Sequence, residues 1–292
     1  MATRQLDRVL DQPAREARAD AEQGRGWYSV LARTGLVAKG VSFGIVGFLA
    51  LKLALGDGGK ATSRQGALQE LAQSSYGTVL LILLAVGFAA YALWRFVQAV
   101  AERKDAGEDE TKAAAKKWGK RAGYVGRGLI YAGLTFSTAK ILLGSGGGQS
   151  QNGKAHQTTA TFLSLPGGPV LVGIAGAIIL GVALWNVYRG LSRKFEDKWR
   201  TGGMSRSART WGGRVGVVGH IARGVVFGLI GVFVIKAAVD YNPKDAIGFD
   251  GALQKLAHTN YGPYLLGLTA AGLICYALYC FVDARYRDVS AN

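Results

Sequence analysis

The apolar residues of this chain are gathered into six long blocks, and neither Asp nor Glu occurs inside any of them. Each block has about 20 residues, and a helix of that length spans about 30 Å, the thickness of the hydrocarbon core of a bilayer. Six helices without a polar face are not expected in a soluble protein, whose surface helices keep one face in water. The blocks therefore predict an all-α, polytopic membrane protein with six transmembrane helices. They cover approximately residues 35–55, 77–97, 123–143, 169–188, 219–239 and 262–282.

The formal charge of +16 is distributed unevenly along the chain. When each Lys and Arg is assigned to the nearer end of its span, 27 of the 35 lie on the side that carries both termini. Because the Lys and Arg of short loops collect on the cytoplasmic side of a membrane, both termini are predicted to be cytoplasmic. Basic residues there favour anionic lipid headgroups as partners. A nucleic-acid partner is not expected, since no signature of a nucleic-acid-binding fold accompanies the charge.

A unit of two spans is written three times. RTGLVAKG at 33–40 aligns with RAGYVGRG at 121–128 and, less completely, with VVGHIARG at 217–224. In the segments that link the two spans, GALQELAQSSYG at 66–77 matches GALQKLAHTNYG at 251–262. Because each unit has an even number of spans, all three copies insert with the same orientation. This predicts three parallel two-helix repeats around a pseudo-threefold axis along the membrane normal.

The repeats predict the organisation of the whole chain. Repeats 1, 2 and 3, each of two spans, are expected at 31–100, 120–190 and 214–284. The remaining segments are a cytoplasmic N-terminal segment (1–30), a charged cytoplasmic connector (101–119), a basic cytoplasmic connector (191–213) and a cytoplasmic tail (285–292).

Several recurring features point to a known family. They are the opening R-x-G-x-x-x-[RK]-G, the run of twelve residues from its last glycine to a lysine, the segment GALQ-x-LA, the YG after it and the closing aromatic residue. Together they resemble the bacterial domain of unknown function 1206 (DUF1206) family over nearly all of the chain beyond residue 30. The second repeat lacks GALQ, and the third has Val217 where Arg33 and Arg121 stand. The resemblance implies a triplicated two-span protein of the bacterial inner (plasma) membrane, and it implies no established activity.

Small residues form a stripe along the first span of each repeat. Such spacing lets helix backbones approach closely in lipid, where the hydrophobic effect does not drive helices together. We expect this stripe to pack helices, and a smooth pore or substrate path is the alternative. The glycines concerned are Gly40, Gly44, Gly47, Gly128, Gly224, Gly228 and Gly231.

Basic residues frame the same three spans at both ends. The inner set consists of Lys39, Arg127 and Arg223, and the outer set of Lys52, Lys140 and Lys236. Long basic side chains near a span end extend to lipid phosphate at low cost. The outer lysines have a second interpretation, in which three ammonium groups surround the pseudo-threefold axis and bind an anion or line its path. Both sets are therefore candidate sites for an anion or a lipid phosphate. Since they are thirteen residues apart, about 140° around a helix, they are not expected to face the same axis.

The segments between the paired spans carry apolar residues at helical spacing, such as Leu68 and Leu71, or Leu253 and Leu256. This pattern predicts short helices lying on the outer interface. Aromatic residues near the inner ends of the second spans are typical of an interfacial belt or of core packing, rather than of ligand stacking. They are Tyr91, Trp94, Trp185, Tyr276 and Tyr279.

The sequence contains no constellation that predicts catalysis. His156, His220 and His258 belong to different repeats, and no group of Cys, His or Asp has the spacing of metal ligands. We therefore expect no catalytic residues, no metal and no cofactor. Two functions remain open. The preferred one is a scaffold or accessory subunit that packs against another membrane protein, a second copy or anionic lipid. The alternative is a channel or transporter for a small anionic solute that uses the repeated lysines.

Overall fold

The computed structural model describes residues 2–56, 63–101, 110–144 and 150–288. Part of the predicted connector 101–119 and part of the predicted tail 285–292 therefore lie outside the described residues. Within these ranges the chain is helical, and its only extended pairing is an isolated bridge between Trp199 and Arg287. The prediction of an all-α fold is confirmed.

The described chain has two kinds of helix, with one short helix between the two long helices of each repeat. The long helices are α1 (Ala2–Ala54), α3 (Gly77–Ala101), α4 (Glu110–Leu142), α6 (Gly168–Leu191), α7 (Arg206–Val239) and α9 (Gly262–Tyr286). The short helices are α2 (Arg64–Ala72), α5 (Gln151–Leu163) and α8 (Phe249–Ala257). Three 3₁₀ turns complete the fold: η1 (Glu196–Lys198), η2 (Thr201–Gly203) and η3 (Pro243–Asp245). We call the end of the molecule that carries the short helices the linker side, and the opposite end, with η1 and η2, the connector side.

Five helical segments are long and apolar enough to cross a membrane, which makes this a multi-pass membrane protein. They are Gly26–Ala54, Gly77–Val100, Gly168–Leu191, Arg206–Val239 and Gly262–Tyr286. The remaining long helix, α4, covers the one predicted block not among these five, 123–143, up to Leu142. Its second half also carries Thr135, Ser137, Thr138 and Lys140, which make it less apolar than the others. A sixth span stays a prediction.

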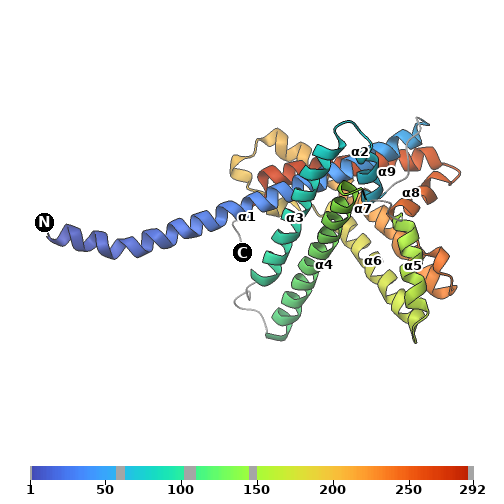
Figure 1. The fold of residues 1–292 in the computed structure, drawn as a ribbon, viewed down its shortest axis with the longest axis horizontal. Coiled ribbons are helices and arrows are strands. Elements are labelled where there is room, and N and C mark those ends of the chain that lie inside the picture. The colour runs from blue at the N-terminus through green and yellow to red at the C-terminus, as the bar shows by residue number, and fades with distance from the viewer. Residues whose placement is uncertain (1, 57–62, 102–109, 145–149, 289–292) are drawn as a thin grey trace.

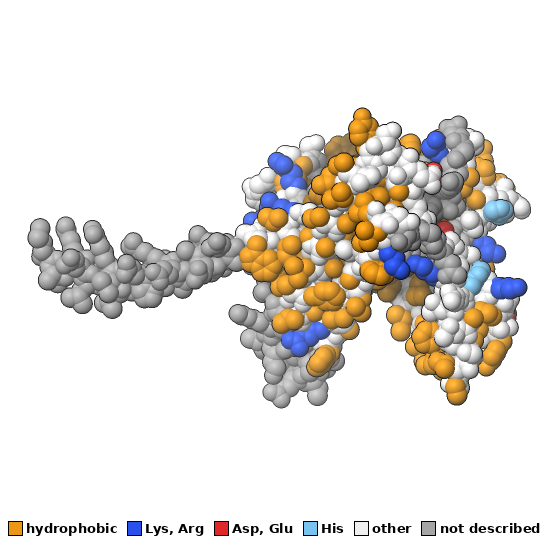
Figure 2. Space-filling model, viewed as in Figure 1, with side chains coloured by type: hydrophobic (Ala, Val, Ile, Leu, Met, Phe, Trp, Pro, Cys, Tyr) orange, Lys and Arg blue, Asp and Glu red, His pale blue; other side chains and the backbone are white. Residues whose placement is uncertain are grey.

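The long helices pack side by side in the order α4, α3, α1, α9, α7, α6. Among the described residues, each helix of this row packs along the next, whereas its two ends, α4 and α6, do not pack along each other. In Figure 1, α3 and α4 form one limb of the molecule and α5 and α6 another, and the two limbs diverge. Figure 2 shows a notch between these limbs. We call the gap between α4 and α6 the seam.

The same turn joins the short helix to the second span in all three repeats. A Cβ atom on Gly77, Gly168 or Gly262 would overlap the carbonyl oxygen of Leu71, Phe162 or Ala257, at the end of the preceding short helix. Only glycine allows this close approach of two backbones. In the second and third repeats, Pro169 and Pro263 follow this glycine in the first turn of the span, where a missing N–H costs nothing.

The predicted small-residue stripes lie against neighbouring helices. On α1, Cβ atoms on Gly40, Gly44 and Gly47 would lie 3.1, 3.6 and 2.9 Å from atoms of α9. On α4, a Cβ on Gly128 would lie 2.7 Å from the Phe96 ring of α3. On α7, Gly224, Gly228 and Gly231 face α6, at 2.5, 3.9 and 2.9 Å. Each stripe therefore contacts the second span of another repeat.

Of the two roles predicted for the aromatic residues of the second spans, the structure shows core packing for four of the five. Tyr91, Trp94, Tyr276 and Tyr279 are at most 2 % exposed and belong to the helix core, whereas Trp185 is 54 % exposed. Leu68 and Leu253 are also fully buried, so the apolar stripes of α2 and α8 pack onto the bundle instead of facing an interface. The physical reason is that the aromatic rings of α3 and α9 and the leucines of α2 and α8 lie where helices pack against one another.

Candidate functional site

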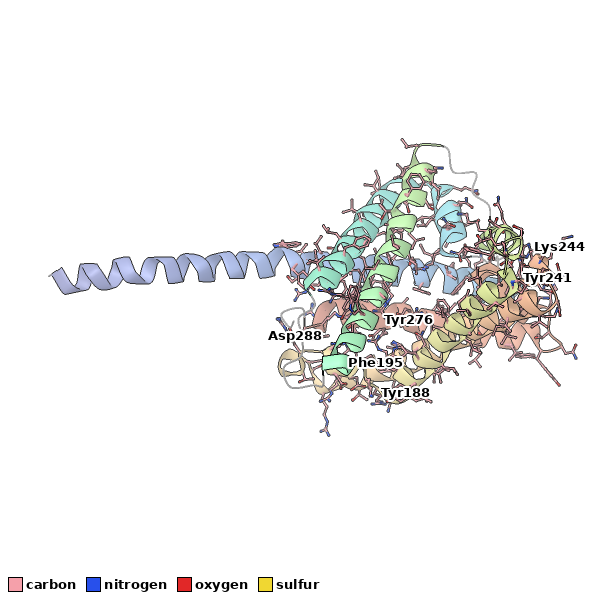
Figure 3. The ribbon with its side chains drawn as sticks, turned by 90° about the horizontal axis from the view of Figure 1, so that it is seen from below. Tyr188, Phe195, Tyr241, Lys244, Tyr276 and Asp288 are labelled. Carbon is pink, nitrogen blue, oxygen red and sulfur yellow. The ribbon has the colours of Figure 1, made fainter. Side chains whose placement is uncertain are left out.

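Two members of the predicted inner set meet on one buried tyrosine. The Lys39 Nζ of α1 lies 5.0 Å from the centre of the Tyr276 ring on α9. From α7, the guanidinium carbon of Arg223 lies 4.4 Å from the same ring centre, and Arg223 Nη1 donates a hydrogen bond of 2.6 Å to the Tyr276 hydroxyl. Tyr276 is 1 % exposed, and Figure 3 shows it in the interior of the molecule. Cation–π contacts of this kind strengthen when they are removed from water.

A second tyrosine continues this arrangement on α3. The Lys39 Nζ lies 5.9 Å from the centre of the Tyr91 ring. Arg95 donates from Nη2 to the Tyr91 hydroxyl and from Nη1 to Gln98 Oε1, both at 2.6 Å. Arg95 is only 5 % exposed, and its Nε has no hydrogen-bond partner among the described residues. The Nε of Arg223 is buried and without a partner in the same way.

Two further arginines come from the helices that border the seam. Arg127 of α4 lies within electrostatic range of Arg95, Arg223 and Arg189, the last of which is on α6. Lys39, Arg95 and Arg223 thus contact Tyr91 or Tyr276, and Arg127 and Arg189 add positive charge from the two helices that border the seam. We call this cluster the basic chamber: Lys39, Arg95, Arg127, Arg189 and Arg223.

The chamber has little negative charge to balance it. Within the five candidate spans the only Asp or Glu is Asp283 on α9. Its Oδ2 accepts a hydrogen bond of 2.6 Å from Arg287 Nη1, and its Oδ1 accepts one of 3.2 Å from Trp199 Nε1. Asp283 is therefore already paired, and the five chamber cations keep only neutral or aromatic protein partners among the contacts described above. Buried cations are costly unless they are paired.

A sixth cation lies near the chamber on the connector side. Burial above all, together with nearby positive charges, lowers the pKa of Lys198 in η1 to about 7. These charges belong to Arg287, Arg189, Arg95 and Arg127. The Lys198 side chain still meets solvent, so it can exchange a proton with the medium near neutral pH. An anion held nearby would stabilise its charged form.

On the linker side, Arg64 extends the line of cations. Its guanidinium carbon lies 5.2 Å from the centre of the Phe43 ring and 5.3 Å from that of Tyr131. The other neighbour of Phe43 is Arg223, whose guanidinium carbon lies 5.3 Å from the ring centre. Arg64, Phe43, Arg223, Tyr276 and Lys39 thus form a column of alternating cations and aromatic rings.

The structure does not bring the outer lysines into this column. Lys236 Nζ lies 2.8 Å from carboxylate oxygens of both Asp240 and Asp245, at the end of α7. Lys140 is exposed, with its Nζ 4.9 Å from the centre of the Phe136 ring on the same helix. Lys52 is half-buried near the end of α1. Of the two predicted sets, the inner one supplies residues that converge.

Sequence reasoning missed Arg95, Tyr91 and Tyr276 as parts of a site. Tyr91 and Tyr276 each lie fourteen residues after the turn glycine of their repeat, and this recurrence is a usable signal. Arg95 has no such signal, because the corresponding residues of the other repeats are Asn186 and Cys280. Its role depends on burial, which the sequence alone does not reveal.

The described residues contain no group of three or more His, Cys, Asp or Glu that could hold a metal ion. His220 is buried, with Nδ1 2.7 Å from the carbonyl oxygen of Gly216 and its ring stacked on Phe195. Cys275 and Cys280 are free thiols. These residues pack the core of α7 and α9.

Comparisons with known proteins agree with the repeated architecture. The chain is 29 % identical over 270 residues to the uncharacterized protein YxxB of Bacillus subtilis (strain 168), an alignment that covers 92 % of this chain and 94 % of YxxB. No solved structure matches the chain significantly. The Domain of Unknown Function DUF1206 matches three times, over residues 34–102, 122–193 and 218–287, close to the repeats seen in the sequence. With three copies along most of its length, the chain belongs to the DUF1206 family.

Proposed function

We propose that the protein is a non-enzymatic scaffold or accessory subunit of the bacterial inner membrane that binds the phosphate-bearing headgroup of an anionic lipid in the basic chamber. The observation that carries this proposal is the group of chamber cations, in which Arg95 Nε and Arg223 Nε are buried donors without a partner among the described residues. A phosphate group offers several acceptor oxygens to such donors, and charge-assisted bonds to it are strong.

The proposed topology has six spans, with α4 as the sixth and the connector side in the cytoplasm. The glycine stripes support a pseudo-threefold arrangement, because α1 packs on α9, α4 on α3, and α7 on α6. The first span of each repeat thus contacts the second span of a different repeat in cyclic order. The excess of Lys and Arg near the connector side supports its cytoplasmic location.

The seam supports a lipid as the source of the phosphate. Arg127 is exposed on α4, and apolar residues on both helices of repeat 2 are exposed as well. They include Leu129 and Ile130 on α4, and Ile178 and Val182 on α6. A lipid can therefore place its headgroup near Arg127 while its chains remain beside these apolar faces.

The test compares the purified protein in nanodiscs of phosphatidylcholine alone and with added phosphatidylglycerol. Because a ligand that binds only the folded state raises its stability, the wild type should unfold at a higher temperature with phosphatidylglycerol. Arg95→Met and Arg223→Met should lose most of this rise. The triple substitution of Lys52, Lys140 and Lys236 by Met is the matched control, and it should keep the rise.

Inorganic phosphate, titrated into phosphatidylcholine nanodiscs, separates the two sources of the ligand. A rise with phosphatidylglycerol alone supports a lipid headgroup, and an equal rise with inorganic phosphate supports a soluble anion instead. If neither probe stabilises the wild type, the chamber is not an anion site and the proposal fails.

The column of Arg64, Phe43, Arg223, Tyr276 and Lys39 favours a second candidate function, the passage of a small anion. Cations that alternate with weakly interacting rings offer an anion several sites without trapping it at one. Flux of chloride or phosphate into proteoliposomes would then fall in Arg64→Met and Lys39→Met. Wild-type proteoliposomes without flux above that of empty liposomes would reject this candidate and leave the lipid-binding proposal intact.

A further inference from the structure

A cavity on the linker side borders the basic chamber: Phe227 in its wall lies against Arg223, whose guanidinium carbon is 5.4 Å from the ring centre. It has a volume of about 650 Å³ and lies among α5, α6, α7 and the start of α8. This size is typical of small-molecule sites in proteins. Its walls include Phe227 and Val234 of α7 and Phe249 of α8.

The walls of the cavity are mainly apolar, and they are buried on one side and exposed on the other. Val172, Val234 and Phe249 are buried, whereas Phe162 and Leu171 are nearly half exposed. The open edge thus follows the surface of α5 and the beginning of α6. Only 22 % of the most apolar part of α6 is buried, compared with 39 to 50 % in the other four candidate spans. We therefore expect the mouth to open toward the hydrocarbon of the membrane.

Two cations stand at the rim of the cavity. Lys154 Nζ donates a hydrogen bond of 3.0 Å to Gln65 Oε1, and Gln65 Nε2 in turn bonds Ser137 Oγ. Arg64, next to Gln65, rests on the rings of Phe43 and Tyr131. The residues that line the cavity include no Asp or Glu. Among the described residues, the contacts shown for both cations are therefore with neutral side chains, at the end of an apolar space.

We propose that this linker-side cavity binds one hydrocarbon chain of an anionic amphiphile from the adjacent leaflet, whose charged head lies between Lys154 and Arg64. The apolar walls match the chain and the two rim cations match the head. The mouth at α5 and α6 lets the amphiphile enter sideways from the bilayer. Its two rim cations are not among the five cations of the proposed headgroup site, although Phe227 in its wall lies against Arg223 of that site.

This occupant fits the cavity better than the alternatives. A free anion would satisfy Lys154 and Arg64 but leave the apolar volume without a partner. An uncharged alkyl chain would fill the volume but leave the two cations unbalanced. Only a ligand that combines both features uses every part of the site.

The test uses dodecyl phosphate with a diazirine group near the end of its chain, added to the wild-type protein in phosphatidylcholine nanodiscs. After irradiation, mass spectrometry should find the label concentrated in peptides covering 158–179 and 227–234. The exposed apolar face of α3, around residues 79–86, reports random labelling from the bilayer. Equal labelling of both regions would overturn the proposal.

Two kinds of variant test separately how the hydrocarbon chain and the charged head of the amphiphile are bound. Val234→Trp, or the milder Ala175→Leu if the first does not purify as a single species, should fill the cavity and abolish the concentrated label while labelling at 79–86 persists. Lys154→Met should weaken labelling by dodecyl phosphate about tenfold, as expected for the loss of a charge-assisted bond. Lys244→Met, an exposed lysine on the same side of the molecule, is the control and should have no effect.

A dodecanol analogue with the same diazirine provides the last arm. It should label the cavity weakly, and to the same extent in the wild type and in Lys154→Met. If dodecanol labels as strongly as dodecyl phosphate, the head has no role and the proposal of an anionic amphiphile is wrong. Arg95→Met, whose contacts do not line the cavity, should leave the labelling unchanged, so failure of the chamber proposal does not affect this result.

Discussion

The two spans of repeats 1 and 3 pack tightly together, whereas those of repeat 2 stand apart. Gly35 of α1 is pressed against Tyr91, and a Cβ on Gly219 of α7 would lie 2.5 Å from the Tyr276 Cα. The corresponding residue of repeat 2 is Gly123, and a Cβ there would meet nothing within 4 Å. The same glycine therefore serves a helix contact in two repeats and none in the third.

The difference lies in the partner helix. Gly87 of α3 and Gly272 of α9 come so close to Ala38 and Ala222 that no Cβ would fit. The equivalent residue of α6 is Ile178, which is 63 % exposed. A contact between backbones needs a small residue on both helices, and one β-branched side chain keeps them apart. Repeat 2 has thereby become the place where the ring of helices is open.

Engineered disulfides should give the largest contrast, which is between a packed interface and the seam. In a background with Cys275→Ser and Cys280→Ser, the pair Gly44→Cys and Ala277→Cys should form a disulfide almost completely under mild oxidation, because their Cβ atoms would lie 3.6 Å apart where α1 packs on α9. The pair Gly126→Cys and Ile178→Cys lies on the two helices of the seam and should stay reduced, because the Cα atoms of a disulfide must lie within about 7 Å. Mass spectrometry without a reducing agent measures both. Efficient oxidation of the second pair would show that the seam closes.

Substitution by alanine of Gly219 in repeat 3 and of Gly123 in repeat 2 should give the next largest difference between the repeats. Gly219→Ala places a methyl group against the backbone of Tyr276, and such overpacking costs about 1–3 kcal/mol. Gly123→Ala meets open space and should be neutral or stabilise the helix by about 0.5–1 kcal/mol. Thermal unfolding in detergent compares the two variants with the wild type. Equal losses at both positions would mean that repeat 2 packs like its neighbours.

The charge near the seam should make stability depend on pH to a moderate extent. Since the pKa of Lys198 is lowered to about 7 in the folded protein, the unfolded chain binds more protons between pH 7 and about 10. The stability contributed by this residue should therefore rise with pH across that window and be lowest below pH 7. In Lys198→Met this rise should shrink, and thermal unfolding at pH 6.5, 7.5 and 9 measures it.

The control for this result is Lys194→Met, at a neighbouring exposed position of the connector, whose pKa is raised by a hydrogen bond with Tyr188. It should keep the pH dependence of the wild type. If Lys198→Met and Lys194→Met behave alike, the charges of Arg127 and Arg189 do not act on Lys198 across the seam.

Substitution of Lys236 should give the smallest effect. Its ion pairs with Asp240 and Asp245 lie in solvent, where such pairs contribute little to stability. Lys236→Met should leave the unfolding temperature unchanged within error, and so should Lys140→Met in repeat 2. A large loss in one of them would indicate that the outer lysines, and not the inner set, distinguish the repeats.

The features that recur in the sequence were predictable, and the features that differ between repeats were not. Six apolar blocks and three aligned glycine openings predicted an all-helical multi-pass fold, which is confirmed, and the family resemblance is confirmed as well. The inner set of Lys39, Arg127 and Arg223 was recognised as a candidate, although the meeting of Lys39 and Arg223 on Tyr276 depends on how the helices rotate. The seam could not be predicted, because Gly123 matches its counterparts and the effect of Ile178 appears only once two helices are compared in space.

In the described part of the chain, the row of helices is packed along its whole length, and its one gap is the seam between its two ends. Its two ends, α4 and α6, can move apart or together by small pivots at the junctions between neighbouring helices, and no interface has to be separated along its length. The distance between α4 and α6 is then set by whatever occupies the seam. A bilayer molecule lodged there would hold it open, and its departure would allow the whole row to tighten.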